Sequence, residues 1–473
     1  MESTSKNFKA NSRRALDDST LQRALGNIKT GFQEKRRQVT SELPEFEALR
    51  DTGRDIKNHV LANLDFYLER FEEKVVENGG VVHWCRTPEE ARKTILDIAR
   101  TRNAKTVTKG KSMVAEEIGL NDYLEENGIE PVETDLGEYI IQLRHEPPSH
   151  IIAPAIHVTR EQIADDFRKY HTDLDPNRRL ETPQDFTDEA RAKLRDRYFA
   201  ADVGVTGANF LIAETGSTVI VTNEGNGDMT QLLGKCHVVI ASLEKIVPTL
   251  EDASTILRLL ARSATGQEMS VYTTFSTGPR RAKDLDGPEE FHVVLLDNGR
   301  SAMLGTEFQD MLRCIRCAAC MNHCPVYAAV GGHAYGWVYP GPMGAVLTPS
   351  LIGVEEAGHL PNASTFCGRC ESVCPMRIPL PKMMRHYRTH EFERDLGSPR
   401  VKSALKLWAG LATRPKLYRF ATGIAMRVLG ALGGKAGKFK SLPLAGGWTK
   451  VRDMPAPQGK TFHQLYGEKK RAA

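Results

Sequence analysis

The sequence predicts an α/β domain with a mainly parallel sheet, preceded by a helical arm and followed by a cysteine-rich domain and a basic helical region. Three observations predict this order. Strand-like and helical segments alternate across residues 79–300, seven of the nine cysteines lie between Cys314 and Cys374, and Lys and Arg dominate the C-terminal segment. At 473 residues the chain is long enough for several domains with separate cores.

Residues 1–78 predict the helical arm. Apolar residues recur at helical spacing from Leu21 to Phe32 and again from Phe46 to Val75. The second helix is expected to end at Asn78-Gly79-Gly80, because glycine can adopt the left-handed conformation that closes a helix. No catalytic or ligand-binding pattern is visible in this arm.

Residues 79–300 predict the α/β domain. Strands are expected at 81–84, 105–108, 130–134, 218–222, 237–241, 270–275 and 291–296, with helices near 88–101 and 252–263 and a helix pair ending at 127–128. Strand–helix alternation is typical of a parallel sheet with helices on its faces. Cys85 and Cys236, in strand-like segments, are interpreted as buried core thiols.

Two polar segments of this domain are weaker candidates. Lys109-Gly110-Lys111-Ser112 matches neither a P-loop nor a dinucleotide-binding pattern, so a solvated turn with Ser112 as a helix cap is favoured. Glu214 and Glu224 flank strand 218–222, where either carboxylate is a candidate acid/base group lining a pocket. Polar turns around the strand are the simpler interpretation.

Residues 301–385 predict a ferredoxin-type domain. Cys314, Cys317, Cys320 and Cys324, followed by Pro325, form the C-x2-C-x2-C-x3-C-P run of a [4Fe–4S] cluster. A zinc site is the alternative, but zinc sites use separated cysteine pairs, whereas this run holds four cysteines in eleven residues. The pattern therefore indicates iron and sulfide.

A second copy of the run lies fifty residues further along the chain, with Cys367, Cys370, Cys374 and Pro375. In two-cluster ferredoxins the last cysteine of each run binds the other cluster. This swap predicts two ligand sets. The first cluster is assigned Cys314, Cys317, Cys320 and Cys374; the second is assigned Cys324, Cys367 and Cys370.

The second set lacks a fourth thiolate, because Ser364 stands where the repeat requires cysteine. The second cluster is therefore either [3Fe–4S] or a [4Fe–4S] cluster with an open or exchangeable fourth ligand. Ser364 is not the favoured ligand, since an alkoxide suits iron–sulfur chemistry less well than a thiolate. Between the two runs, His333 is interpreted as a satisfied loop histidine, with a hydrogen bond to cluster sulfur as the alternative.

Residues 386–473 predict a basic C-terminal domain. From Arg400 to Ala473 there are 16 Lys/Arg against 2 Asp/Glu, so this segment carries +14 and the rest of the chain −10. No recognised module or stacking platform suggests nucleic acid. Arg13-Arg14 is not followed by an apolar stretch, and no run could span a bilayer. We expect a cytoplasmic protein, with the basic region as a candidate for docking on the inner membrane face.

Six segments together resemble the lactate utilization protein B family over nearly the full length of the chain. They are KGKSMVAEEIGLN (109–121), VETDLGEYIIQL (132–143), PSHIIAPAIH (148–157), AETGSTVIVTNEGNGDM (213–229), CIRCAACMNHCPVY (314–327) and GGHAYGWVYPGPMG (331–344). The resemblance implies an LUD domain with a sheet like those of phosphosugar isomerases and CoA-transferases, then a two-cluster ferredoxin domain and a family-specific C-terminal domain. The family pattern itself carries seven cluster cysteines, in agreement with Ser364.

The resemblance also implies a role in oxidising L-lactate to pyruvate with two companions, a cysteine-rich protein with CCG motifs and a free-standing LUD protein. No flavin or nicotinamide motif is present and no catalytic residue is assigned, so we expect a non-catalytic electron-transfer subunit. The alternative is an LUD-domain enzyme acting on a phosphosugar or acyl-CoA, with regulatory or structural clusters. A cluster-based sensor that binds nucleic acid is a third hypothesis.

Overall fold

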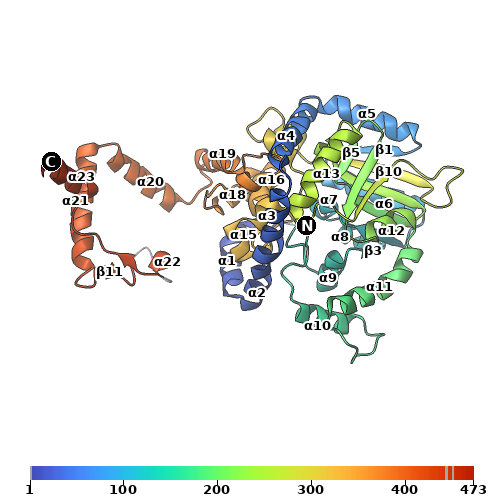
Figure 1. Cartoon of the computed structure of the whole chain (residues 1–473), viewed down its shortest axis with the longest axis horizontal. Coiled ribbons are helices and arrows are strands. Elements are labelled where there is room, and N and C mark those ends of the chain that lie inside the picture. Colours follow the sequence, from blue (N-terminus) through green and yellow to red (C-terminus); the bar gives the residue numbers. More distant parts are fainter. Residues whose placement is uncertain (1–2, 443–445, 450–451, 473) are drawn as a thin grey trace. The chain divides into compact units, whose positions relative to one another are not determined.

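The computed structural model describes residues 3–442, 446–449 and 452–472, and it divides into two compact units, Met1–Arg394 and Asp395–Ala473. The first unit is built on a six-stranded sheet (Figure 1). The cysteine-rich helices share one apolar core with a smaller sheet and with helix α13 (Leu250–Ala264).

The six-stranded sheet has the order β1-β10-β7-β4-β2-β3, and all of its neighbouring strands are parallel. Its strands are β1 (Val81–Cys85), β2 (Thr106–Gly110), β3 (Glu130–Glu133), β4 (Val203–Gly207), β7 (Cys236–Ser242) and β10 (Glu290–Leu296). The predicted α/β domain with a parallel sheet is confirmed.

Helices cover both faces of this sheet. On the face of Val238 and Ile240 lie α6 (Pro88–Thr101), α7 (Met113–Ile118) and α8 (Leu120–Glu126). On the face of Val239 and Ala241 lie α4 (Phe46–Ala62) and α5 (Leu64–Glu77). Side chains alternate between the faces of a strand, so a strand covered on both sides is apolar throughout.

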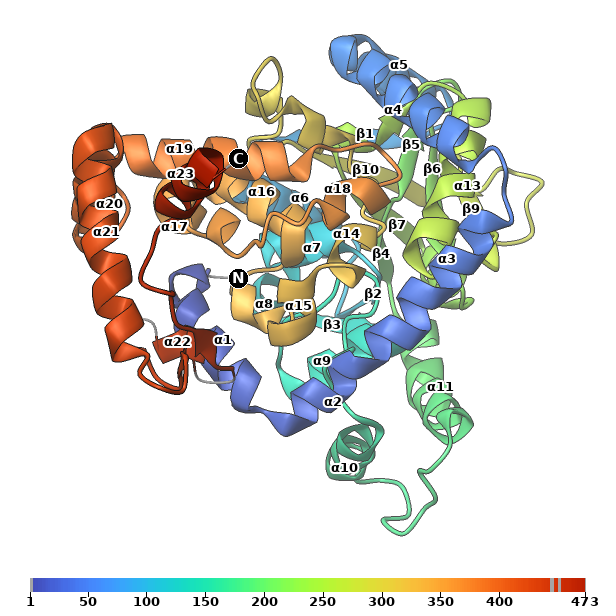
Figure 2. The ribbon, with the colours of Figure 1, turned by 60° about the vertical axis from the view of Figure 1, so that its left-hand side comes forward.

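The predicted N-terminal helices are confirmed, and two of them pack directly on the parallel sheet. Residues of α4 and α5, among them Val60 and Phe71, are fully buried against the sheet, so these helices form one of its layers. Of the remaining helices, α1 (Phe8–Asp17) and α2 (Ser19–Ile28) lie alongside the cysteine-rich helices (Figure 2), and α3 (Glu34–Ser41) packs against α13. The predicted end at Gly79 is confirmed by its φ of 86°.

Strand β4 was not predicted, because two of its five residues are glycines, which usually indicate turns. Gly204 allows helix α12 (Asn226–Leu232) to approach the sheet closely. A Cβ atom at this position would lie 1.8 Å from the carbonyl oxygen of Thr230. The glycine is therefore required by packing.

Two predicted strands belong to a second sheet, which corrects their assignment to the parallel one. Its order is β8-β5-β6-β9, where β5 and β6 form an antiparallel hairpin and β9 pairs antiparallel with β6. The strands are β5 (Phe210–Ile212), β6 (Ser217–Thr222), β8 (Ile246–Val247) and β9 (Tyr272–Ser276). The short turn before β6 forces the antiparallel pairing, because a parallel pair needs a long crossover.

A small helical lobe follows β3 and has an apolar cluster of its own around Phe167 and Phe186. It consists of α9 (Leu136–Arg144), α10 (Arg160–Tyr170) and α11 (Pro183–Ala200). Both α10 and α11 begin with complete capping boxes, at Thr159 and Thr182.

The cysteine-rich region consists of short helices, gathered beside α1 and α2 in Figure 2. They are α14 (Ala319–Asn322), α15 (Pro325–Val330), α16 (Gly341–Ile352), α17 (Val354–Ala357), α18 (Arg369–Val373) and α19 (Leu380–Glu393), with 3-10 turns at Gln309–Arg313, His333–Tyr335 and Leu360–Asn362. The predicted helical ferredoxin-type region is confirmed.

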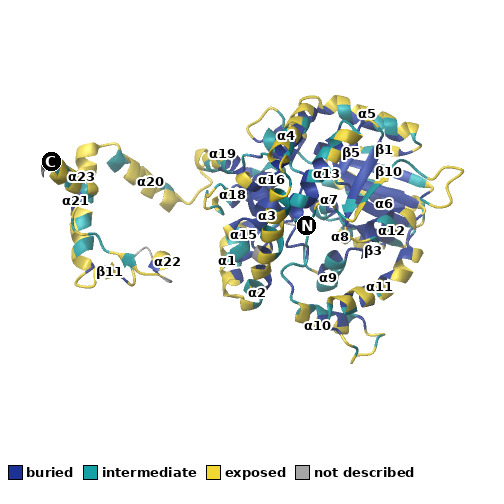
Figure 3. Ribbon diagram, in the orientation of Figure 1, coloured by how far each residue is buried: buried dark blue, intermediate teal, exposed yellow. Residues whose placement is uncertain are grey.

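The second unit contains α20 (Pro399–Ala412), α21 (Pro415–Leu432), α22 (Gly446–Thr449) and α23 (Phe462–Ala472), with a short antiparallel pair of β11 (Lys438–Phe439) and β12 (Met454–Pro455). Helices α20 and α21 are largely exposed (Figure 3). Residues 443–445 and 450–451 of the predicted basic region lie outside the described residues. No helix within the described ranges has both the length and the apolar character needed to cross a bilayer.

Candidate iron-sulfur centre

The first cysteine run follows a 3-10 turn and bends twice through left-handed backbone. Arg316 and Ala318 have φ angles of 59° and 60°, on either side of Cys317. Helix α14 then carries Cys320, and Cys324 caps α15, whose first residue is Pro325. Two bends within three residues make a tight loop. A cysteine run needs such a loop if it is to enclose one small cluster.

The second run repeats this backbone, not only the cysteine spacing. Phe366 and Gly368, fifty residues after Arg316 and Ala318, have φ angles of 52° and 76°. Helix α18 begins at Arg369, as α14 begins at Ala319. The internal duplication is therefore present in the fold.

The structure brings the seven predicted ligands together around two separate cavities. One is lined by Cys314, Cys317, Cys320 and Cys374, and the other by Cys324, Cys367, Cys370 and Ser364. Cys324 and Cys374 thus each face the cavity of the other run. The ligation itself stays a prediction, as do the iron count of the second cluster and the role of Ser364.

The chemistry of these thiols fits an iron–sulfur group. Burial raises the pKa of Cys374 to about 11 and of Cys370 to about 12, and it raises the pKa of Cys317 as well. Such thiols are neutral at neutral pH unless bound iron supplies the positive charge that stabilises a thiolate. A backbone N–H of Arg369 instead lowers the pKa of Cys367, which is exposed.

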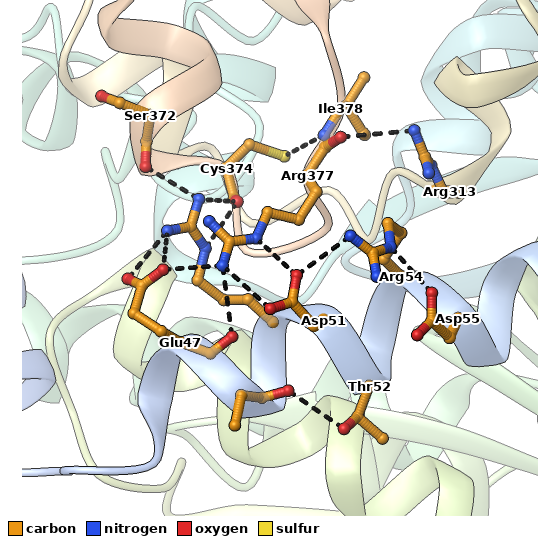
Figure 4. A network of polar contacts seen from close by, with 12 residues as sticks. Glu47, Asp51, Thr52, Arg54, Asp55, Arg313, Ser372, Cys374, Arg377 and Ile378 are labelled. Carbon is orange, nitrogen blue, oxygen red and sulfur yellow. Dashed lines mark hydrogen bonds and ion pairs between the residues drawn. The ribbon is translucent and has the colours of Figure 1, made fainter.

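Helix α4 holds the second run in place. Arg50 donates hydrogen bonds to the backbone carbonyls of Ser372 and Cys374, and Glu47 pairs with the same guanidinium at 2.8 Å. Arg377, just after the run, pairs with Glu47 and Asp51 (Figure 4). No role in holding the cysteine runs was predicted for this helix. The sequence feature that could have indicated such a role is the set of polar residues on α4 that lie away from its apolar stripe.

The first run is tied to the α/β domain by buried polar contacts. Nε2 of His150 contacts Oδ1 of Asn322 at 2.9 Å, while its Nδ1 accepts two backbone N–H groups. Arg316 donates to Glu244 at 2.8 Å, and Glu244 also pairs with Arg300. Burial opposes ionisation of Glu244, but these two guanidinium groups hold its pKa at about 2.

A cavity of about 210 Å³ lies at the carboxyl ends of strands β2, β4 and β7, beside the first cysteine run. Ligands of open parallel sheets bind at this edge. Lys111, Lys245 and Arg316 contribute its cationic groups, and Glu224 lies at its wall. Glu214, the other carboxylate proposed as an acid/base group, does not line this cavity and accepts a backbone hydrogen bond from Leu250.

The Lys109–Ser112 segment corrects one expectation and confirms another. Ser112 caps α7 as predicted, accepting the N–H of Ala115. Lys109 is not solvated: it is 1% exposed and is paired with Glu116 and, at 2.7 Å, with Glu133. Glu116 lies on the helix that Ser112 caps, but Glu133 lies on β3, and the sequence around the turn does not indicate that β3 pairs with β2.

The remaining candidates are structural. His333 contacts the carbonyl of Pro147 at 2.7 Å and lines neither cysteine cavity. Cys85 and Cys236 are buried, as predicted. Cys236, Glu290 and His292 lie close enough to share a metal ion, but Arg102 already pairs with Glu290 at 2.5 Å and neutralises it.

Comparisons with known proteins identify three families along the chain. Family models match in three places: the LUD domain over residues 68–296, the 4Fe-4S dicluster domain over 310–378, and the C-terminal domain of lactate utilisation protein B over 394–471. The domain bounds predicted at residues 78, 300 and 385 stay a prediction.

Similar proteins match nearly the whole chain. Lactate utilization protein B of Lysinibacillus sphaericus is 44% identical over 98% of this chain and 97% of its own length. The protein of the same name from Bacillus subtilis is 42% identical over 98% and 96%. YkgF, an uncharacterized electron transport protein of Escherichia coli K12, is 42% identical over 97% and 96%.

Proposed function

The chain belongs to the lactate utilization protein B family, and from this premise we propose that it is the iron–sulfur electron-transfer subunit of a complex that oxidises L-lactate to pyruvate. Iron–sulfur clusters, when bound, exchange single electrons, at potentials set by their surroundings. The first cysteine set would hold a [4Fe–4S] cluster. The second would hold either a [3Fe–4S] cluster or a [4Fe–4S] cluster with an open or exchangeable fourth ligand.

The observation that carries the proposal is the different placement of the two cysteine cavities. The cavity of the first set shares Ile151 with the cavity at the sheet edge and is lined by buried residues such as Cys317. The cavity of the second set includes the exposed Cys367. Two centres arranged from the interior toward the surface suit a relay to a protein partner.

Partners follow from the same proposal. Lactate chemistry would take place on a companion subunit, either the protein with CCG motifs or the free-standing LUD protein. The basic second unit would dock on an anionic membrane surface, where the electrons are delivered. Helices α20 and α21 support this, because they contain no acidic residue and expose Leu407, Trp408 and Phe420 beside their lysines and arginines.

The test is electron paramagnetic resonance of the anaerobically isolated protein, alone and with its co-purifying companions, before and after L-lactate. We expect lactate to reduce the clusters only in the complex. Clusters that dithionite reduces and lactate never reduces would contradict the proposal. They would favour the alternative, an LUD-domain enzyme acting on a phosphosugar or acyl-CoA.

A further inference from the structure

The cavity at the edge of the parallel sheet receives a cation from the cluster-binding run itself. Arg316 lies between Cys314 and Cys317 in the chain, yet its side chain lines this cavity together with Lys245. Both side chains are buried, each 8% exposed. The left-handed backbone at Arg316 belongs to the loop of the first cysteine run. Arg316 therefore contributes its backbone to that loop and its side chain to the cavity lining.

The guanidinium of Arg316 has an unused donor. Its Nη2 donates to Glu244 at 2.8 Å and its carbon lies 5.2 Å above the Tyr339 ring, but its buried Nη1 has no hydrogen-bond partner. Lys245 makes no ion pair within the described part of the chain. A buried donor without a partner is costly, so Arg316 and Lys245 favour an anionic ligand between them.

The cavity is also lined by apolar side chains. Ile220 and Val221 of β6, and Leu260 and Ala264 of α13, are among them. A site lined by both cationic and aliphatic side chains suits an organic acid better than a free inorganic anion. We propose that this cavity binds a small organic carboxylate, held by Arg316 and Lys245. The identity of that acid, L-lactate or its product pyruvate, rests on the proposed function: this chain would bind the acid, and its oxidation would take place on the companion subunit.

The cavity lies next to the cavity of the first cysteine set. Ile151 lines both this cavity and the cavity of Cys314, Cys317, Cys320 and Cys374. A carboxylate bound here would lie in a cavity that shares Ile151 with the cavity of the first cluster, and it would contact the guanidinium of the cluster loop. Occupancy of the site would therefore be sensed at the cluster through Arg316.

Isothermal titration calorimetry on the anaerobic full-length holoprotein tests the proposal, with L-lactate, pyruvate and inorganic phosphate as separate titrants. The variant Lys245→Met removes one cation while keeping an aliphatic stem. Its matched control, Lys235→Met, changes an exposed lysine of the same domain outside the cavity. We expect Lys245→Met to weaken carboxylate binding about tenfold or more and the control to leave it unchanged.

A second variant keeps the proposal testable if Lys245→Met fails to fold. Ala264→Leu fills the cavity from its apolar wall and should also abolish binding. Carboxylate should in addition shift the resonance spectrum of the first cluster in the wild-type protein. Absence of carboxylate binding, equal binding by Lys245→Met and Lys235→Met, or binding of phosphate alone would each overturn the inference.

The inference and the proposed function can fail separately. If lactate reduces the clusters in the complex but no carboxylate binds the isolated chain, the proposed function stands and this site is refuted. If carboxylate binds as expected and lactate never reduces the clusters, the site stands and the relay is refuted.

Discussion

Arg50 donates from Nε and Nη2 to the backbone carbonyl of Cys374, at 3.1 and 2.7 Å, across 324 residues of sequence. The arginine is 4% exposed, so these hydrogen bonds are made away from water. A helix near the N-terminus thereby supports the loop that ends in the last cluster cysteine. The cluster domain therefore depends on N-terminal residues that contain no cluster ligand.

Replacing this arginine tests that dependence. Arg50→Met should lower the free energy of unfolding by about 3 kcal/mol, because carbonyls of the second run lose charged hydrogen bonds in a buried setting. It should also speed the release of iron. Urea unfolding and iron release into a chelator, both under anaerobic conditions, measure the two effects. Arg37→Met, which removes an exposed arginine of α3 that pairs with the exposed Glu34, is the control and should change neither.

The assignment of the seven cysteines to two clusters can be tested at Cys324 and Cys374, each of which lines the cavity of the other run. Cys324→Ser should remove the resonance signal of the second cluster, although Cys324 belongs to the first run. Cys374→Ser should remove the signal of the first cluster. Iron content and electron paramagnetic resonance of each variant decide the matter. Loss of the opposite signal in either variant would refute the swapped assignment.

Ser364 lies at the cavity of the second set, and its Oγ accepts the N–H of Phe366 at 3.1 Å. Ser364→Ala should keep the second cluster, since a serine ligand is not expected. Ser364→Cys should complete a set of four thiolates and slow the loss of iron in air. Mössbauer spectra of the two variants report the iron count. Loss of the second cluster in Ser364→Ala would show that the serine binds iron.

His237 predicts a pH dependence of stability that is independent of the clusters. It is buried in β7, with Nε2 2.8 Å from the hydroxyl of Thr206, and burial lowers its pKa to about 3. In the unfolded chain this histidine binds a proton below about pH 6.5, whereas in the folded chain it stays neutral down to about pH 3. Its contribution to the free energy of unfolding is therefore fully present above pH 6.5 and is lost as the pH falls toward 3.

The expected slope from this residue is at most about 1.4 kcal/mol per pH unit below pH 6.5. Chemical unfolding of wild-type protein and of His237→Gln between pH 7 and pH 5 measures the contribution. The free energy of unfolding of His237→Gln should decline less steeply as the pH falls than that of the wild-type protein. Parallel curves for the two proteins would contradict the role assigned to His237.

Membrane docking by the second unit predicts binding to vesicles that contain anionic lipid. Full-length protein should co-sediment with phosphatidylglycerol vesicles, bind phosphatidylcholine vesicles weakly, and dissociate at high salt. Phe420→Ser on α21, where the ring is 67% exposed, should weaken this binding severalfold. Phe66→Ser, which removes an exposed phenylalanine of α5, is the matched control. Equal binding to both kinds of vesicle would contradict an electrostatic role for the basic region.

Local sequence patterns predicted much of the fold because they depend on near neighbours. Apolar segments with helix caps between them indicated the parallel sheet, and glycines such as Gly79 indicated where helices end. Strand β4 was missed because its glycines serve the approach of α12, which no local pattern reveals. The strands around Val219 and Phe275 were assigned to the wrong sheet because strand propensity does not specify a pairing partner.

The sequence by itself determined the chemistry of the candidate site. Cysteine spacing and a fifty-residue repeat indicate iron–sulfur ligands, because a tight loop around a small cluster needs thiolates at short fixed intervals. Only the tertiary structure decided what surrounds those ligands. Arg50, the pairing of Arg316 with Glu244, and the burial of Lys109 join residues that are distant or on separate elements. Such contacts form when helices and sheets pack, and local spacing does not encode them.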